Sequence, residues 1–489
     1  MSSRLAHALV FVASAAVLVL EILAGRLLAP YVGVTLETFT AIIGVVLAGI
    51  ALGTWQGGRL ADRHDPRPLL PLAFGLGGAL SIASVPLLRI VGEADLGTGP
   101  DAVILLAALA FFLPATVLSA VSPLVVKLRL GSVEHTGEVV GRLSAVSTAG
   151  SLTGVFLTGF VFVARFPVTP VVVGVGAALV ALGLVLWFVR RDAVPGERMM
   201  GCVTLALAAG ALTVITPAAC DEDTTYYCAR VEVDPERASG RVLYLDDQRH
   251  SYVDLTDPTY LGFTYTRMLA DVVDAIAPAG DPIDTVHIGG GGFTMPRYLA
   301  ATRPGSTNRV LEVDPGVVDI ARRELGLGPL PGLTTRTGDG RVLLRELADG
   351  SADLVIGDAF GSETVPWHLT TREFARDVRR VLRPDGIYAL NLIDHPPMRF
   401  AAAELVTLQD VFAHVTLLAP PDRLNGTDTG GNVILLASDA PLPLDAIRAA
   451  IARRGDDVAV ATADQLQRLA GDGQVLTDEF APVDQLHTP

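Results

Sequence analysis

The chain has 489 residues, of which half are hydrophobic, and its mean hydropathy is +0.46. This composition excludes an ordinary soluble protein. Residues 1–219 hold 13 basic and 11 acidic side chains, whereas residues 220–489 hold 24 basic and 41 acidic ones. So acidic a second half argues against a nucleic-acid partner, because phosphate binding needs a basic surface. The three cysteines and scattered histidines show no metal-ligand spacing, so we expect no metal site.

The first half contains apolar runs of the length that a membrane-spanning helix needs, which is about 20 residues. The seven runs are Leu5–Leu28, Phe39–Leu60, Leu69–Leu88, Ala102–Val126, Val139–Val163, Val168–Val189 and Met199–Ala219. Glycine and alanine recur in them at a spacing that lets helix backbones approach closely in lipid. Because six runs follow the first, we favour a spanning helix over a cleaved signal peptide there. We therefore predict an all-helical, multi-pass membrane domain over residues 1–219.

The basic residues of this domain fall mainly on one side of the predicted spans. Ten of them share that side, and by the positive-inside rule it is cytoplasmic, as is the N-terminus: Arg4, Arg59, Arg63, Arg67, Lys127, Arg129, Arg142, Arg190, Arg191 and Arg198. Seven spans then place the second half outside the cytoplasm, although one span more or fewer would reverse this. Cys220 and Cys228 flank a short loop and are disulfide candidates, which would require an oxidising compartment; two free thiols are the alternative.

The second half alternates strand and helix patterns. We expect a linker with a small β element over residues 220–280 and a helix at Thr264–Ile276. A Rossmann-like domain over 281–440 and a helical C-terminal extension over 441–489 follow. The expected strands cover residues 229–233, 241–247, 251–255, 286–289, 309–314, 333–339, 353–358, 386–393, 414–418 and 432–438. Such alternation predicts an α/β fold with a parallel sheet and helices on both of its faces.

Chemistry-bearing residues follow successive strands of this predicted sheet. Gly289–Gly292 form a turn between a strand and a helix, with Gly289 and Gly291 placed to let a ligand approach the backbone. Glu312 ends the next strand, where a carboxylate can accept both ribose hydroxyls. Asp339 with Gly340, and then Asp358, end the following two strands; a single acid at such a place is commonly only a helix cap. We predict that these three acids converge on one pocket that binds an adenosine-bearing ligand.

These residues resemble the spermidine synthase family of the class I methyltransferase fold. EILAGRLLAPY at residues 21–31 and VPWHLTTREF at 365–374 are similar to fused major-facilitator/spermidine-synthase proteins, and GGRLADRHDPR at 57–67 resembles a cytoplasmic loop of major-facilitator transporters. The resemblance implies that Glu312 holds the ribose and that Asp339 and Gly340 hold the adenine. It further implies that Asp358 serves the amine being alkylated, with Tyr265 beside it.

Departures from the family pattern concentrate at the diamine end of the site. The family's aspartate in the glycine turn is Gly292 here, and its second aspartate after the fourth strand is Gly361, with Glu363 close by in sequence. Arg267 replaces a glutamate, His250 replaces a glutamine, and the loop PPDRLNGTDTGG offers no tyrosine. A diamine needs a carboxylate at both ends, because a buried unpaired ammonium costs several kcal/mol. We therefore expect an acceptor other than putrescine.

Three functions remain open from the sequence. The first is transfer of an aminopropyl or related group from decarboxylated S-adenosylmethionine to a small-molecule amine, with Asp358 and Tyr265 catalytic and with His250, Glu363 and Arg267 shaping the acceptor pocket. The second is methyl transfer from S-adenosylmethionine, whose carboxylate Arg267 would bind. The third is a non-enzymatic transporter or sensor with a nucleotide-binding domain. The lipid bilayer is the other expected partner, and a homodimer stays open.

Overall fold

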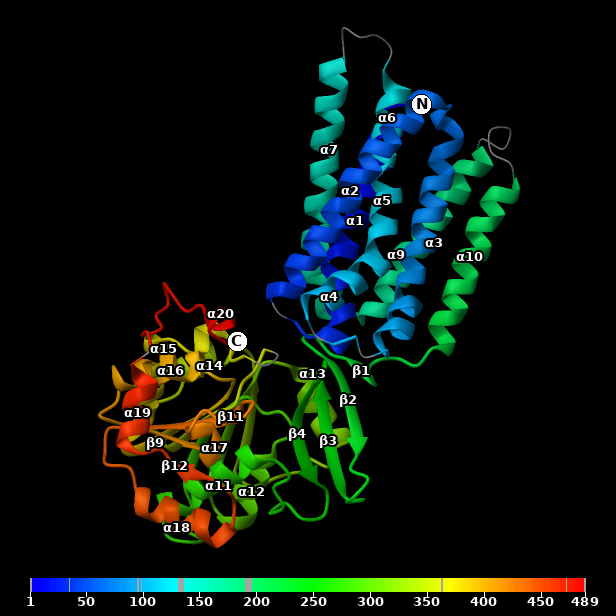
Figure 1. Ribbon diagram of the computed structural model, residues 1–489. Coiled ribbons are helices and arrows are strands. Elements are labelled where there is room, and N and C mark those ends of the chain that lie inside the picture. Colours follow the sequence, from blue (N-terminus) through cyan, green and yellow to red (C-terminus); the bar gives the residue numbers. More distant parts are fainter. Residues whose placement is uncertain are drawn as a thin grey trace. The chain divides into compact units, whose positions relative to one another are not determined.

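The computed structural model describes residues 2–34, 36–94, 96–97, 99–130, 136–189, 196–361, 364–471 and 473–487 (Figure 1). The chain divides into two compact units, Met1–Cys228 and Ala229–Pro489. The first unit is helical apart from a short strand, and the second contains both strands and helices. The division falls a few residues beyond the expected boundary at residue 219, because the loop closed by Cys220 and Cys228 belongs to the helical unit.

Within the described residues, the first unit has seven helical stretches that are long and apolar enough to cross a membrane. Two of them contain a segment of π-helix. The stretches are α1 (Ser3–Val32), α2 (Leu36–Arg63), α3 (Pro66–Gly92), α4–η1–α5–α6 (Pro100–Ala107, Ala108–Phe112, Leu113–Ser119, Val121–Arg129), α7–η3–α8 (Thr136–Leu157, Thr158–Phe162, Val163–Arg165), α9 (Val168–Val189) and α10 (Gly196–Ile215).

Small residues let these helices pack with their backbones in contact. A side chain at Gly53 of α2 would place its Cβ atom 2.1 Å from the carbonyl oxygen of Thr116 on α5. A side chain at Gly78 of α3 would meet the carbonyl oxygen of Gly176 on α9 at 2.4 Å. Close approach of this kind is the packing that glycine permits between helices in lipid, where the hydrophobic effect does not drive association.

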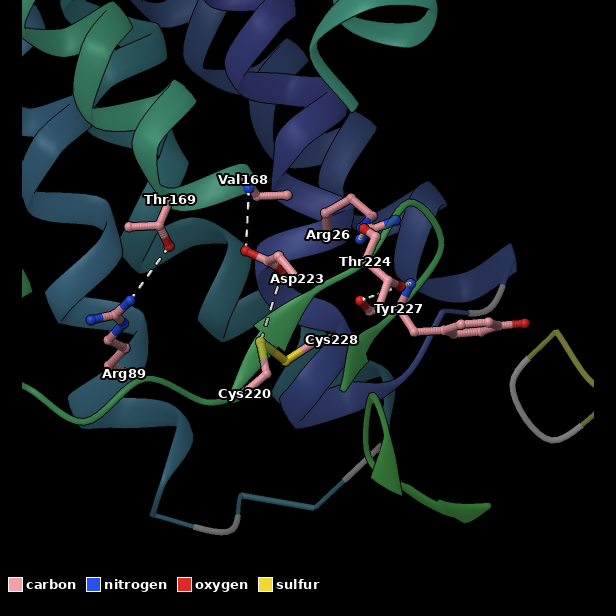
Figure 2. The surroundings of a disulfide bond; sticks show 9 residues. All are labelled: Arg26, Arg89, Val168, Thr169, Cys220, Asp223, Thr224, Tyr227 and Cys228. Atoms are coloured by element: carbon pink, nitrogen blue, oxygen red, sulfur yellow. Dashed lines mark hydrogen bonds between the residues drawn. A yellow bond between two sulfur atoms is a disulfide. The ribbon is translucent and has the colours of Figure 1, made fainter. Parts of the chain in front are cut away.

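The loop between Cys220 and Cys228 is tied to the first helix (Figure 2). A disulfide joins the two cysteines, whose Cα atoms lie 5.3 Å apart, so the alternative of two free thiols does not describe the structure. The guanidinium of Arg26, on α1, donates hydrogen bonds to the carbonyl oxygens of Thr225 at 2.6 Å and Thr224 at 2.9 Å. Arg26 therefore holds the loop against its own end of the helical unit.

Two sheets follow in the chain. The smaller has the order β1-β2-β3-β4, with antiparallel pairing of β2 to β3 and of β3 to β4. Its strands are β1 (Glu222–Asp223), β2 (Cys228–Val233), β3 (Gly240–Leu245) and β4 (Gln248–Asp254). Helix α11 comes next and covers Thr264–Ile276, as the sequence pattern predicts.

The larger sheet has eight strands in the order β12-β10-β11-β9-β8-β5-β6-β7. These are β5 (Asp284–Ile288), β6 (Thr307–Glu312), β7 (Leu333–Thr337), β8 (Ala352–Gly357), β9 (Leu382–Asp394), β10 (His414–Ala419), β11 (Gly431–Ser438) and β12 (Ala459–Val460). Strands β5 to β9 pair in parallel, but β11 runs antiparallel to both β9 and β10. The parallel pairing that the alternation predicts therefore holds for β5 to β9, whereas the sheet as a whole is mixed. The connection between β10 and β11, over residues 420–430, is too short for a crossover between parallel strands, so these two strands pair antiparallel.

Helices cover both faces of this sheet (Figure 1). On one face, α11 packs with α12 (Thr294–Thr302) and α18 (Leu444–Arg454) over a core that includes Leu269, Leu299 and Ile447. The other core includes Leu344, Phe374 and Phe400, from α14 (Gly340–Arg345), α15 (Arg372–Val381) and α16 (Arg399–Gln409). The remaining elements are α13 (Pro315–Arg323), η5 (Trp367–Leu369), α17 (Pro421–Leu424), α19 (Ala463–Ala470) and α20 (Val483–His487).

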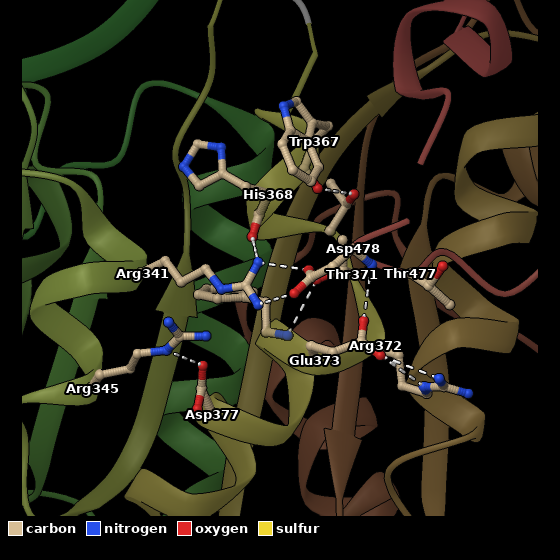
Figure 3. A network of polar contacts seen from close by, with 12 residues as sticks. Arg341, Arg345, Trp367, His368, Thr371, Arg372, Glu373, Asp377, Thr477 and Asp478 are labelled. Atoms are coloured by element: carbon tan, nitrogen blue, oxygen red, sulfur yellow. Dashed lines mark hydrogen bonds and ion pairs between the residues drawn. The ribbon is translucent and has the colours of Figure 1, made fainter. Parts of the chain in front are cut away.

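The last fifty residues are part of the α/β domain and not a separate extension. Strand β12 pairs with β10, and Leu476 and Val483 are buried in the core under α16. Asp478 accepts hydrogen bonds from both terminal nitrogens of Arg341, at 2.7 Å each, and from the Thr371 hydroxyl at 2.7 Å (Figure 3). The boundary expected at residue 440 therefore cuts through the domain. The sequence did not reveal this, because a two-residue strand and a polar tail give no recognisable pattern.

Candidate functional site

The carboxyl ends of strands β7, β6, β5 and β8 lie next to one another, as their order in the sheet requires. Backbone hydrogen bonds continue the pairing past the strand ends: Gly289 N donates to Leu311 O, and Asp358 N donates to Ile288 O, each at 2.9 Å. Glu312 is the last residue of β6, and its carbonyl accepts from Gly338 N at 2.9 Å. The glycine turn and the predicted acidic residues thus occupy one edge of the sheet.

The turn after β5 requires glycine at two positions. Gly289 has a φ of +96°, and a Cβ atom there would lie 2.2 Å from the carbonyl oxygen of Asp358. Gly291 has a φ of +46°, and its Cβ atom would lie 2.5 Å from Ser251 Oγ and 3.1 Å from His250 Nδ1. The turn is therefore packed between β8 and β4, and this packing brings His250 to the sheet edge.

Glu312 binds the glycine turn through its side chain. Its Oε2 atom accepts hydrogen bonds from Gly290 N at 2.7 Å and Gly291 N at 3.3 Å, and its Oε1 atom accepts from Asp314 N at 2.9 Å. Burial raises the pKa of Glu312, and these N–H groups oppose the rise. Each carboxylate oxygen can accept more than one hydrogen bond, so Glu312 can hold the turn and still accept from ligand hydroxyls.

Asp339 begins the helix after β7. Its Oδ1 atom accepts from Val342 N at 2.9 Å, which is an N-cap, and its Oδ2 atom lies 2.9 Å from His368 Nε2. Gly340 lies beside β5, because a Cβ atom there would be 2.8 Å from Ile288 Cγ2. The helix-cap interpretation of Asp339 is thus realised, and the histidine of the VPWHLTTREF segment contacts the same carboxylate. The sequence of this segment shows the family resemblance but gives no signal for a role of His368.

Asp358 lines a cavity of about 390 Å³. Its Oδ1 atom accepts a hydrogen bond from Asn391 Nδ2 at 2.8 Å. Burial raises the pKa of Asp358 to about 6, and hydrogen bonds from Asn391 and Tyr265 oppose the rise. Burial and the nearby Asp358 raise the pKa of the Tyr265 hydroxyl well above its ordinary value. The pair therefore consists of a phenol that stays protonated and a carboxylate poised to take up a proton near neutral pH.

His250 lies in the same cavity, next to the glycine turn. Burial lowers its pKa to about 4, so the imidazole is neutral at pH 7. Its Nδ1 atom lies 3.4 Å from Ser251 Oγ. A neutral imidazole can donate or accept a hydrogen bond but adds no charge to the cavity.

Not every predicted residue lines this cavity. Glu312 and Asp339 lie at the same sheet edge as Asp358 but are not among the lining residues. Arg267, which we expected to shape the acceptor pocket, is not among the lining residues, and its Nε atom forms an ion pair with Asp456 at 2.8 Å. Glu363 lies outside the described residues.

Sequence reasoning missed several residues of the cavity. Asn391 is buried inside the apolar strand β9, and a lone amide in the run GIYALNLI is the signal that could have found it. Arg249 on β4 and Arg423 on α17 also line the cavity, each in a segment that reads as ordinary polar surface. These arginines become neighbours of Asp358 only through tertiary folding.

Comparison with known proteins supports the resemblance. No family model matches the chain. A polyamine aminopropyltransferase of Vibrio vulnificus is 29% identical over 242 residues, which are 46% of this chain and 75% of that protein. Polyamine aminopropyltransferase 2 of Streptomyces coelicolor is 26% identical over 418 residues, 81% of this chain and 68% of that protein, an alignment long enough to extend into the helical unit.

Among solved structures, a probable spermidine synthase from Corynebacterium glutamicum is 28% identical. The match covers 55% of this chain and 99% of that one, with a TM-score of 0.49. The chain is homologous to the polyamine aminopropyltransferases, and its second unit is a Rossmann-like domain of the class I methyltransferase type.

Proposed function

We propose that this protein is a membrane-anchored transferase that moves an aminopropyl or related group from a decarboxylated S-adenosylmethionine-type donor to an amine other than putrescine. The observation that carries the proposal is Asp358, a carboxylate whose pKa burial raises to about 6, facing a cavity beside the glycine turn that Glu312 holds. Homology to the polyamine aminopropyltransferases supports the same reaction class.

The reaction needs little chemistry from the protein. The lone pair of the acceptor nitrogen forms a bond to the methylene carbon beside the sulfonium, the carbon–sulfur bond breaks, and its electron pair stays on sulfur as a neutral thioether. The new ammonium must then lose a proton, which Asp358 can accept because its pKa lies near neutrality. Asn391 and Tyr265 fix the orientation of that carboxylate, and correct positioning of the two reactants supplies most of the remaining acceleration.

The donor's nucleoside would be held at the neighbouring strand ends. Glu312 is placed to accept from ribose hydroxyls, and Asp339 with Gly340 forms the start of α14 where a purine ring could lie. His368 contacts Asp339 and would set the orientation of its carboxylate. The absence of a side chain at Gly292 has a steric reason, since a Cβ atom there would lie 2.9 Å from Val253 Cγ2.

Methyl transfer from S-adenosylmethionine is the second candidate, and the structure weakens it. One support was Arg267 as the partner of the methionine carboxylate, but that guanidinium is paired with Asp456. The other support is Gly292, which removes an aspartate that would repel the same carboxylate, and it is unchanged. A transporter or sensor remains the non-enzymatic alternative. A second unit outside the cytoplasm would favour a sensor, because adenosyl cofactors are made in the cytoplasm.

Calorimetric titration of the full chain in detergent tests these functions. We expect decarboxylated S-adenosylmethionine and its thioether product to bind more tightly than S-adenosylmethionine and its own thioether. The reverse order would favour methyl transfer. Tight binding without any turnover over a broad amine panel would favour a sensor, and binding of neither cofactor would reject the nucleoside site.

We also propose that the N-terminus is cytoplasmic and that the second unit lies outside the cytoplasm. The distribution of basic residues supports this orientation, as does the Cys220–Cys228 disulfide, which needs an oxidising compartment. The test is labelling of intact cells with a membrane-impermeant maleimide, using a cysteine introduced at the exposed Glu236 of the second unit. Labelling of this cysteine in intact cells is expected, and labelling only after lysis would reverse the orientation.

A further inference from the structure

The cavity beside Asp358 carries an unusual set of charges for a site that would bind a polycation. Asp358 is the one carboxylate among the described residues that line it, while two arginines, Arg249 and Arg423, line it as well. His250 is neutral at pH 7 because burial lowers its pKa to about 4. The lining therefore offers one anchor for an ammonium group and two guanidinium groups elsewhere in the same space.

Arg423 builds one wall of the cavity. Its guanidinium donates to Asn432 O at 2.6 Å and to Asp428 Oδ2 at 2.9 Å, and the side chain is only 14% exposed. Its charge is thus offset by Asp428, and its donors fix the loop between β10 and β11. Asn432 in turn donates to Asn391 Oδ1 at 3.1 Å, which connects this wall to Asp358 through two amides.

Arg249 is in a different situation. It is exposed on β4, and its guanidinium lies 5.3 Å from the centre of the Phe263 ring, a second residue of the cavity lining. No ion pair of Arg249 is found among the described residues. Asp234 experiences its charge at longer range, but the Oδ2 atom of Asp234 already accepts from the Tyr252 hydroxyl at 2.7 Å. Within the part of the chain that the structure describes, no carboxylate pairs with Arg249, so its positive charge is open to a ligand.

We propose that the acceptor is a primary amine that carries an anionic group, such as a carboxylate, at its far end, and that Arg249 binds that group. This rests on the proposed transferase function, with the amine nitrogen at Asp358. A second ammonium group placed near Arg249 would meet a like charge without a counter-ion. A carboxylate there gains a charge-assisted hydrogen bond from a guanidinium whose planar shape matches it.

Three acceptors of similar length and different terminal charge test the proposal: 4-aminobutanoate, butylamine and putrescine. With the full chain in detergent and decarboxylated S-adenosylmethionine as donor, kcat/KM should be highest for 4-aminobutanoate and lowest for putrescine. Shorter and longer ω-amino acids then show which length fits best. Arg249→Gln should reduce the ratio of 4-aminobutanoate to butylamine by roughly tenfold or more, the effect of losing a hydrogen bond to a charged group. Arg249→Glu should shift the preference toward putrescine.

Arg241→Gln is the matched control, because Arg241 lies on the neighbouring strand β3 and donates to the backbone of its own turn. It should leave the acceptor ratios unchanged. A wild-type preference for putrescine, or an equal effect of Arg249→Gln on all three acceptors, would overturn the proposal. If no acceptor is alkylated, calorimetric titration with 4-aminobutanoate in the presence of methylthioadenosine tests acceptor binding separately from transfer. Binding of 4-aminobutanoate that depends on Arg249 keeps the acceptor inference and rejects the transferase. Absence of that binding rejects the acceptor inference.

Discussion

Asn391 donates a hydrogen bond of 2.8 Å from its side-chain nitrogen to Oδ1 of Asp358. Because its side-chain oxygen accepts from Asn432 at 3.1 Å, the Asn391 amide cannot turn over without losing both contacts. Three strands, β8, β9 and β11, thus cooperate to orient one carboxylate. The hydrogen bond also opposes the rise that burial causes in the pKa of Asp358.

Replacing Asn391 by leucine should shift the pH dependence of the reaction. Loss of a hydrogen bond that favours the ionised carboxylate raises the pKa of Asp358 above its present value of about 6. A base must be ionised to act, so the acidic limb of kcat/KM should move to higher pH by about one unit, the usual effect of one such bond. The profile of Asn425→Leu, at an exposed asparagine, should match the wild type, and an unshifted limb in Asn391→Leu would show that Asp358 is not the base.

Asp358→Asn should stabilise the domain while abolishing transfer. The carboxyl group of Asp358 has an ordinary pKa of 3.8 and a folded pKa of about 6, so the folded protein binds the proton more tightly than the unfolded chain. The free energy of unfolding therefore falls as pH rises between these values, and this loss remains above pH 6. It amounts to about 1–3 kcal/mol, allowing for partial solvation of the cavity.

Hydrogen exchange of peptides from β5 and β8 in the full chain measures this difference. Protection in Asp358→Asn should exceed that of the wild type at pH 8, and the difference should disappear near pH 4. Equal protection at pH 8 would mean that water or an unseen counter-charge already solvates the carboxylate.

Glu312→Ala should loosen the glycine turn and weaken donor binding together. Three backbone N–H groups, of Gly290, Gly291 and Asp314, lose their acceptor, at a cost of about 1–3 kcal/mol. We expect a lower melting temperature and at least a tenfold loss of donor affinity by calorimetry. Glu346→Ala removes an exposed glutamate paired with Arg336 and should change neither quantity. Unaltered donor binding in Glu312→Ala would remove this carboxylate from the nucleoside site.

Asp478→Ala should release the C-terminal segment. Arg341, whose side chain is 10% exposed, would lose its bidentate partner, and Thr371 its acceptor. Because Asp478 itself is 41% exposed, water can replace part of the interaction, and we expect a loss of about 1–2 kcal/mol. Faster proteolysis after residue 460 is the measurement. Asp319→Ala, at an exposed pair with Arg322, serves as the control and should leave the cleavage rate unaltered.

Removing the disulfide by Cys220→Ser should loosen the loop that Arg26 holds. Closing a loop with a sequence separation of 8 is worth about 2–3 kcal/mol in the chain-entropy description. We expect faster hydrogen exchange of residues 220–228, whereas Cys202→Ser, at the free buried cysteine of α10, should not affect that segment. Equal exchange in both variants would show that the Arg26 hydrogen bonds suffice.

The apolar periodicity and the residues at the strand ends allow much of the fold to be predicted from the sequence. Apolar runs of spanning length predicted the seven apolar helices, and the run-and-turn pattern predicted the strands from β2 to β11 within a few residues of their bounds. Glu312, Asp339 and Asp358 could be placed at one sheet edge because parallel strands in neighbouring positions must end together. These features are local or repeat along the chain, so no distant contact is needed to read them.

Only the tertiary structure decided which groups share a cavity. Arg249 from β4, Asn391 from β9 and Arg423 from α17 meet around Asp358 although more than a hundred residues separate the first from the others. The same folding pairs Arg267 with Asp456, brings His368 to Asp339 and adds β12 to the sheet beside β10. A side chain's direction depends on the packing of both faces of its element, and residue type alone does not record that packing.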